Sequence, residues 1–447
     1  MNERALISTV PLAERRIGFY EYFFVLMLML YAGRSIIFFE SQLMTENPVG
    51  VLLPVVLSGI LAFRWKLYFT PRFFLLLFFF FLYFLAVSLK YYDLRPTFIL
   101  TYFFLFFIAY TTISVLKFNF FLIYEKILYY FAAVSLFIWG FQVLTGDDFL
   151  FGIILRIPFL EEISFVSGGG LSTIVYSIQP YATTLINEHI ISRNCGFAWE
   201  PGSYSSYLAL GIFINLFLAE KNKSTQNRFW VLLLAILSTM STTGYVLLAI
   251  IMVFYLMNRD FRKVVLLFPV AALALILFFS LPFMKDKIVE LVKEPESLDE
   301  MVYQAAGRER NITPQRFSSL IITLIDFKNN PFLGIAAHAS ESWVEQAGSS
   351  ISPISGIGNL MAQFGLAGLI PFLIFSVRSS ILFSRYFKYR GKFLLFLIII
   401  GISISYTIIF IPFIMCFWLF SLFEPDFSEV IPERGSGSLI YQRQTKI

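Results

Sequence analysis

The feature that most constrains this sequence is the recurrence of apolar runs, each about 15–20 residues long, along its whole length. A helix rises about 1.5 Å per residue, so such runs approach the length needed to cross a hydrocarbon core of about 30 Å. Hydrophobic residues fill 58% of the 447 positions and charged residues only 14%, and the mean hydropathy is +0.76. We therefore expect an all-α polytopic membrane protein, a single integral membrane domain over 1–447 with about twelve transmembrane helices, eleven being the alternative.

The positions of Lys and Arg predict how these helices are oriented. In an arrangement of twelve crossings, 22 of the 34 Lys and Arg residues fall in seven segments on one face: 1–18, 64–72, 117–126, 220–228, 258–263, 377–392 and 424–447. Basic residues favour the cytoplasmic face, which places the N-terminus and a flexible tail at 424–447 there. Two long loops, 146–202 and 284–357, fall on the outer face. The net charge of +5 reflects this topology, and we expect no nucleic-acid partner.

The apolar run 229–257 has basic residues at both ends, so we predict a hairpin that enters and leaves the membrane on one face. Each arm has only about 12–15 residues, or roughly 18–22 Å of helix, so the turn lies below the outer surface. Irregular backbone at that depth must be buried in protein or reached by water. We expect a polar cavity open to the outer face, with Ser241, Thr242 and Thr243 at its floor. The alternative is one long tilted helix. The run 393–423, which Pro412 interrupts, likewise fits one long span or two short ones.

The first long loop ends in "RNCGFAWEPGS", which pairs a cation, Arg193, with a carboxylate, Glu200, just before an apolar run. Pro201 suits the first turn of a helix, which puts Glu200 at or near the N-cap. A carboxylate there is stabilised by the helix dipole. Capping alone would explain Glu200, but it does not explain Arg193.

The second long loop contains an amphipathic helix, which we predict at 314–327. Thr313 and Pro314 form a helix start, and an apolar stripe follows at the spacing of one helix face, formed by Phe317, Leu320, Ile321, Leu324 and Ile325. Arg308 and Arg310 precede this helix, and Arg316 lies near its N-terminal end. Three arginines there fit a solvated face. They also fit phosphate binding, because the guanidinium suits bidentate capture of phosphate oxygens.

Other polar positions support secondary interpretations. Asn359 and Gln363 begin the span after the second loop and are candidates to line the cavity. The short loop 90–96 is either an ordinary interface loop or an aid to anion binding. Cys195 and Cys416 stand in different settings, so we expect no disulfide, and the sequence has no metal-ligand spacing.

Four segments resemble, in order, the superfamily of Wzy-type O-antigen and exopolysaccharide polymerases and O-antigen ligases. They are "RNCGFAWEPGSYSSYLALGIF", "LSTMSTTGY", "RFSSLIITLIDFKNNPFLGIA" and "GIGNLMAQFGLAGLIPFL", and together they span about 193–376. In that family an Arg stands about fifteen residues before a Pro-x-x-Gly in the large periplasmic loop, as Arg316 stands before Pro331. The sequence departs from the family pattern at Gly334-Ile335-Ala336, where a Gly-x-Gly is usual, and at Thr243-Gly244, where many relatives have Ser-Arg.

The resemblance implies a GT-C-like glycosyltransferase in the bacterial inner membrane, with its long loops in the periplasm. It implies a polymerase that moves a growing glycan from undecaprenyl diphosphate onto the next lipid-linked repeat unit. The expected partners are the lipid-linked oligosaccharide and membrane lipids, with a chain-length regulator and a flippase as further candidates.

The chemistry of such a transfer assigns roles to the candidate residues. A leaving diphosphate needs fixed positive charge, for which Arg193 and Arg316 are the candidates and Arg308 the reserve. The attacking hydroxyl needs a general base, and Glu200 is the best-placed carboxylate. His338 lies near the place where ligases carry a functional His. We expect no metal and no cofactor.

Two other functions fit the sequence. An O-antigen ligase would use the same donor and transfer the glycan to lipid A core. A transporter of lipid-linked glycans would also have many spans, but transporters often contain two-fold repeats, and residues 1–220 show no correspondence with 221–447.

Overall fold

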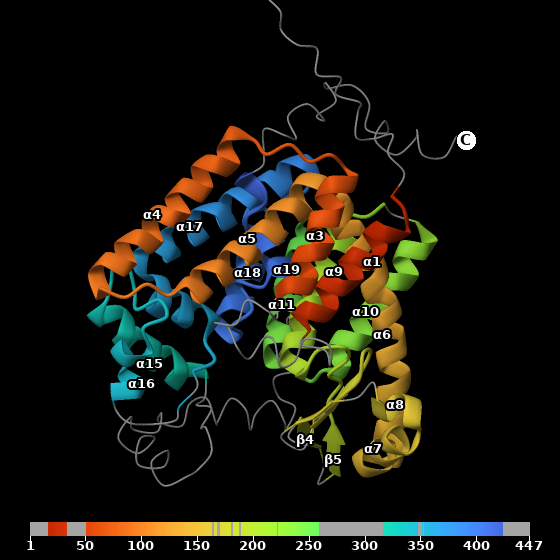
Figure 1. Cartoon of the computed structure of the whole chain (residues 1–447). Coiled ribbons are helices and arrows are strands. Elements are labelled where there is room, and N and C mark those ends of the chain that lie inside the picture. The colour runs from red at the N-terminus through yellow and green to blue at the C-terminus, as the bar shows by residue number, and fades with distance from the viewer. Residues whose placement is uncertain are drawn as a thin grey trace, which may run out of the picture.

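A computed structural model describes residues 17–33, 51–162, 165–167, 170–179, 182–186, 189–220, 222–258, 316–346, 351 and 353–422. This part of the chain is mostly helical (Figure 1). The longer helices are α1 (Phe19–Ala32), α3 (Leu52–Arg64), α4 (Pro71–Tyr91), α5 (Pro96–Leu116), α6 (Asn119–Thr145), α7 (Asp147–Arg156), α9 (Pro201–Phe217), α10 (Lys223–Ser238), α11 (Thr242–Met257), α15 (Arg316–Asn329), α17 (Gly356–Tyr386) and α18 (Leu394–Ser405). Short helices are α8 (Pro158–Glu162), η3 (Ala339–Glu341), α16 (Trp343–Gln346) and α19 (Pro412–Trp418).

Four of the described helices, α4, α5, α6 and α17, are long and apolar enough to cross a membrane. Shorter apolar helices are α1, α3, α11 and α18. The count of about twelve crossings stays a prediction. Residues 1–16, 259–315 and 423–447 lie outside the described residues, and they include the predicted cytoplasmic tail and residues 284–315 of the second long loop.

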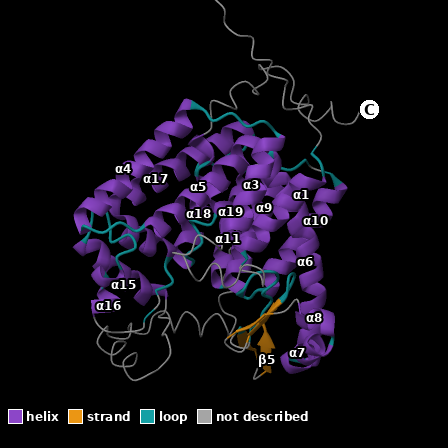
Figure 2. Cartoon of the chain, viewed as in Figure 1, coloured by secondary structure: helices purple, strands orange, loops and turns teal. Residues whose placement is uncertain are grey.

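The prediction of an all-α fold is wrong for the first long loop, which contains five short strands (Figure 2). Antiparallel strands β1 (Phe165–Ser167), β2 (Gly170–Ser172) and β3 (Ser177–Ile178) form one sheet, and β4 (Thr183–Ile186) pairs with β5 (His189–Ser192). The segments of β4 and β5 are rich in Thr and Ile, which favour strands. These short strands were not recognised in the sequence, because the long apolar runs on either side have a helical period.

Helix α9 lies at the centre of the bundle (Figure 1). From Pro201 to Leu216 every residue except Ser203 is buried, and α9 packs against α6, α10, α11 and α18. Gly211 lets a side chain of α6 come close, because an added methyl group would overlap Leu128. A helix that is apolar on all sides is stable only when neighbours surround it.

The run 229–257 is a hairpin, as predicted, and the single-helix alternative is wrong. Helix α10 ends at Ser238 and α11 begins at Thr242, with Met240 between them at φ +47°. The start of α10 and the end of α11 lie beside segments 117–126 and 377–392, which are both predicted to be on the cytoplasmic face. Arg228 of α10 forms an ion pair with Glu125, and the Asn258 amide donates to the carbonyl oxygen of Arg390 at 2.6 Å.

Helix α17 is interrupted at Gly365, whose φ is +58°, and the segment after α15 fills the gap. The N–H groups of Ile335 and Ala336 donate to the carbonyl oxygens of Ala362 and Gln363. In return the N–H groups of Leu366 and Ala367 donate to those of Pro331 and Phe332. Four backbone groups that the broken helix would leave unpaired are therefore satisfied.

The second ambiguous run consists of two helices. Helix α18 ends at Ser405 and α19 starts at Pro412, which occupies the first helical turn. The side chains of α19 are buried, so this short helix is enclosed by the bundle.

Replacing Gly365 with Ala tests the interlock between α15 and α17. An alanine would adopt a left-handed conformation, and its Cβ would lie 2.6 Å from the backbone of Phe332. We expect a loss of about 1–3 kcal/mol, measured as a lower apparent Tm at a fixed heating rate. Gly140→Ala is the matched control, because nothing lies within 4 Å of the added methyl group and alanine favours a helix. Equal melting of the two variants would contradict the interlock.

Candidate functional site

Arg193 lies where the first long loop meets the turn of the α10–α11 hairpin. Its Nε donates to the carbonyl oxygen of Thr239 at 3.0 Å. The backbone N–H of Asn194 donates to the carbonyl oxygen of Ser238 at 3.1 Å, and the Asn194 amide donates to the Oγ of the same serine at 2.9 Å. The loop thus satisfies carbonyl groups that the end of α10 leaves unpaired, and it fixes the guanidinium at the break.

The Arg193 side chain is half-buried, and no carboxylate of the described residues lies within ion-pair distance of it. Burial lowers the pKa of Arg193, an effect opposed by Tyr406, Cys195, Tyr245 and Glu200. A guanidinium nevertheless stays protonated in a protein. A partly desolvated cation without a counter-ion gains free energy when an anion binds beside it, so this position suits a negatively charged ligand.

Glu200 occupies the N-cap position of α9 but does not cap the helix through its side chain. Its backbone is extended, and no backbone N–H of α9 donates to the carboxylate. The carboxylate accepts instead from the Oγ of Ser203 at 3.2 Å, and the residue is exposed. Helix capping by hydrogen bonding therefore does not account for Glu200, which leaves its oxygens accessible close to Arg193.

The N-terminal ends of three helices meet around Tyr406, directly after α18. A methyl group on Gly202 of α9 would overlap the Tyr406 hydroxyl, and one on Gly356 of α17 would overlap the Tyr406 carbonyl oxygen. At the start of α11, the Oγ1 of Thr243 lies 2.9 Å from the Oγ of Ser405. Helix N-termini attract anions through free N–H groups and the helix dipole. Helices α10 and α18 also end here, and Arg193 covers the Thr239 carbonyl of α10.

Two of the predicted binding residues make structural contacts near the Tyr406 segment. Ser241 is buried and caps α11, since its Oγ accepts from the N–H of Gly244 at 3.4 Å. Asn359, in the first turn of α17, donates a long hydrogen bond of 3.4 Å to the carbonyl oxygen of Pro353. Thr242 is half-buried at the first position of α11. All three lie at helix starts beside the Tyr406 segment.

Arg316 is the first residue of α15, and its backbone lies at the same end of the molecule as the start of α17. The two helices run in the same direction, because a methyl group on Gly358 would meet Thr323, and one on Gly365 would meet Phe332. Helix α15 covers the predicted amphipathic segment. Arg308 and Arg310 lie outside the described residues.

His338 belongs to a second polar cluster, between the α4–α5 loop and the segment after α15. Its ring stacks on Tyr91 with centroids 4.2 Å apart, and its Nε2 lies 3.6 Å from Oδ2 of Asp93. Lys90 donates to Oδ1 of Asn330 at 2.5 Å. Within the described part of the chain, no hydrogen bond or ion pair joins His338 to Arg193 or Glu200, so these three predicted residues do not form one hydrogen-bonded constellation.

Sequence reasoning missed Tyr406 and the partners of His338. Tyr406 follows an apolar helix, and its only sequence signal is the approach to Pro412. Asn330 and Tyr91 stand 239 residues apart, with the Tyr91 hydroxyl 3.1 Å from Oδ1 of Asn330. No local pattern marks such a pair. In the sequence, the charges of the short loop 90–96 marked it as a candidate aid to anion binding. The sequence did not show that this loop contacts the segment after α15.

No group of three or more His, Cys, Asp or Glu side chains with metal-ligand geometry occurs among the described residues. A metal-independent reaction therefore stays a prediction that needs a direct test with a chelator.

Residues 228–375 match the model of the O-antigen ligase family. The match confirms the resemblance to the O-antigen ligase and polymerase superfamily, whose members are glycosyltransferase-like enzymes. It covers the hairpin, α15 and the first part of α17, whereas Arg193 and Glu200 precede it. None of the curated proteins compared with the chain matches it.

The thiol of Cys195, two residues after Arg193, tests whether the loop is packed as described. The residue has 0% exposure, and burial raises the pKa of its thiol, so little reactive thiolate forms. Cys416 is also buried. We expect the folded protein to react with a maleimide at pH 8 at least about 100-fold more slowly than the Ser340→Cys variant, whose added thiol is exposed. Rapid labelling of Cys195 in the folded protein would show that the loop is open.

Proposed function

We propose that this protein is a polysaccharide polymerase at the periplasmic face of the bacterial inner membrane. It transfers a growing glycan from undecaprenyl diphosphate onto the next lipid-linked repeat unit. The observation that carries the proposal is the half-buried Arg193, which pairs with no described carboxylate and interacts with Tyr406, where three helix N-termini meet. That arrangement fits a diphosphate, and the O-antigen ligase family match supports the substrate class.

In the proposed reaction the hydroxyl oxygen of the acceptor sugar attacks the anomeric carbon of the donor glycan. The new glycosidic bond forms as the bond between that carbon and the diphosphate oxygen breaks. Glu200 accepts the hydroxyl proton as general base. Arg193 and Arg316 stabilise the negative charge that develops on the leaving diphosphate, with Arg308 as a further cation. Ser241, Thr242 and Asn359 bind the substrate at the helix starts beside the Tyr406 segment.

An O-antigen ligase is the second candidate, favoured by the description of the matched family and by His338. The Nε2 of that residue is buried without a hydrogen-bond partner among the described residues, and it faces Asp93 at 3.6 Å. A histidine held beside a carboxylate is suited to proton transfer. In a ligase, His338 would receive the proton from a hydroxyl of the lipid A core.

The deciding experiment is an assay with purified protein, the lipid-linked repeat unit alone and a chelator present, followed by separation of the glycan-lipid products on a gel. A ladder of products establishes a metal-independent polymerase. Transfer that occurs only after lipid A core is added makes the protein a ligase. If neither assay gives a product and the protein translocates lipid-linked glycan in vesicles, it belongs among the transporters.

Removal of either arginine is expected to abolish long-chain product. Arg193→Ala and Arg316→Ala should each lower the turnover rate by about 10²–10³-fold, because one charge contact to the leaving group is lost. Arg193→Lys should restore part of the rate, since it keeps the charge without the planar donors. Arg156→Ala, an exposed arginine of the same loop, is the control. Normal chain length in the Arg193 and Arg316 variants, at normal membrane levels, would defeat the assignment.

Glu200→Gln separates a base from a structural residue. Because the carboxylate makes no capping hydrogen bond, Gln and Ala should both lower the rate by about 10²–10⁴-fold without changing Tm. Asp148→Asn, at an exposed position of the same loop, should leave the rate unchanged. Activity that survives in Gln but is lost in Ala would favour a structural role for Glu200.

A further inference from the structure

A polar cavity of about 840 Å³ lies at the other end of α10, away from the Arg193 site. It is bounded by α1, α6, the end of α9 and the start of α10. Helix α10 has 16 residues, or about 24 Å, so the two sites are separated by most of a helix. The cavity lies between segments 117–126 and 220–228, which the distribution of Lys and Arg predicts to be cytoplasmic.

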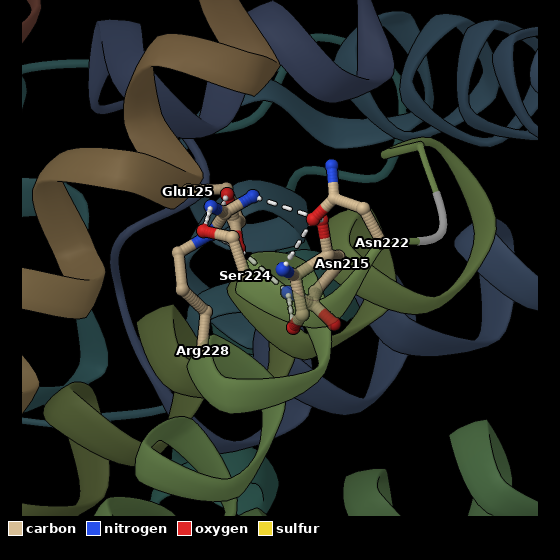
Figure 3. A network of polar contacts seen from close by, with 6 residues as sticks. Glu125, Asn215, Asn222, Ser224 and Arg228 are labelled. Carbon is tan, nitrogen blue, oxygen red and sulfur yellow. Dashed lines mark hydrogen bonds and ion pairs between the residues drawn. The ribbon is translucent and has the colours of Figure 1, made fainter.

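One wall of the cavity is a buried ion pair (Figure 3). Glu125 is 1% exposed, and the Nε of Arg228 donates to both of its carboxylate oxygens at 2.8 and 3.1 Å. The Asn215 amide donates to the same carboxylate at 2.6 Å. The pair ties α6, α9 and α10 together, and its charges cancel.

The Arg228 guanidinium keeps donors for another ligand. Besides Nε, its Nη1 donates to the Oγ of Ser224 at 2.9 Å and its Nη2 to the Oγ1 of Thr225 at 3.2 Å. Arginine has five N–H groups, so two have no acceptor among the described residues. The Oδ1 of Asn222 caps α10 by accepting from the N–H of Thr225, which leaves the Asn222 amide group at the cavity wall.

The remaining charges of the lining are positive in balance. Lys126 and Lys223 line the cavity, and neither forms an ion pair with a described carboxylate. The only other charged lining residue is the exposed Glu220. With Glu125 and Arg228 neutralising each other, the cavity carries one excess positive charge.

The aromatic side chains around this cavity are typical of the depth of lipid headgroups. Tyr22 and Tyr129 line it, and Tyr130, also in the lining, is 68% exposed. Trp230 follows Arg228 by two residues in α10, and it is 54% exposed. Tyr and Trp gather at membrane interfaces, where one end of the side chain is apolar and the other reaches water. A basic pocket between helices at this level matches sites for anionic headgroups.

We propose that this cavity binds the phosphodiester of an anionic phospholipid from the cytoplasmic leaflet. Lys126 and Lys223 neutralise the phosphate, the remaining N–H groups of Arg228 and the Asn222 amide donate to its oxygens, and the tyrosines contact the glycerol region. The bound lipid links α1 to the α6–α10 pair. A free phosphate ion offers the same oxygens but none of the apolar contact, so the lipid is the favoured source.

The test uses the purified full-length protein, delipidated in detergent, and native mass spectrometry with phosphatidylglycerol as the probe. Lys126→Ala/Lys223→Ala removes the two unpaired cations without disturbing the Glu125–Arg228 pair. Arg72→Ala/Lys392→Ala removes two exposed cations from other predicted cytoplasmic segments and is the matched control. We expect the lysine variant to bind phosphatidylglycerol at least about 10-fold more weakly than the wild type, and the control to bind it normally.

Two further arms identify the ligand. Phosphatidylglycerol should raise the apparent Tm of the wild type and of the control but not that of the lysine variant, and phosphatidylcholine should raise none of them. Inorganic phosphate at millimolar concentration should have no effect. Equal phosphatidylglycerol binding by both double variants would overturn the site, and stabilisation by phosphate equal to that by phosphatidylglycerol would overturn the assignment to a lipid.

Discussion

The structure depends on one constraint, that every backbone N–H and C=O group in an apolar surrounding must be paired. An unbroken helix meets this constraint by itself, but apolar helices are interrupted at three places within the part of the chain that the structure describes. After α10, Arg193 and Asn194 bond to the carbonyl groups of Thr239 and Ser238. Within α17, the segment after α15 supplies donors and acceptors for the turn around Gly365. After α18, the chain turns at Tyr406 among the ends of other helices. The first two breaks are satisfied by segments distant in the sequence.

This arrangement links stability to the candidate site. Arg193, which satisfies the break after α10, is also a half-buried cation without a carboxylate partner among the described residues. Its backbone and Nε contacts hold it in place, so the charge is positioned before any ligand binds. A preorganised cation stabilises developing negative charge without the cost of reorientation. The same logic applies to the helix N-termini around Tyr406, whose N–H groups are fixed by the helices themselves.

Much of the architecture could be predicted from the sequence because it follows from local patterns. The hairpin break followed from basic residues at both ends of 229–257, and α15 followed from its apolar stripe. The pair Arg193 and Glu200 stood out because both charges precede a buried helix. The strands of the first loop were not predicted, since two to four residues of Thr, Ile and Ser give no clear period beside long helical runs. Tyr406 had no signal of its own.

The sequence by itself indicated a membrane protein, a break in the apolar run 229–257, and the superfamily that the chain resembles, because hydropathy, charge and short motifs are local properties. Only the tertiary structure decided which helix breaks lie next to each other in space. It placed His338 beside Asp93, put Arg193 at the α10–α11 turn, and enclosed Glu125 and Arg228 within a polar cavity. Those encounters join residues 46 to more than 200 positions apart. They depend on how helices distant in the sequence pack together, which no local pattern encodes.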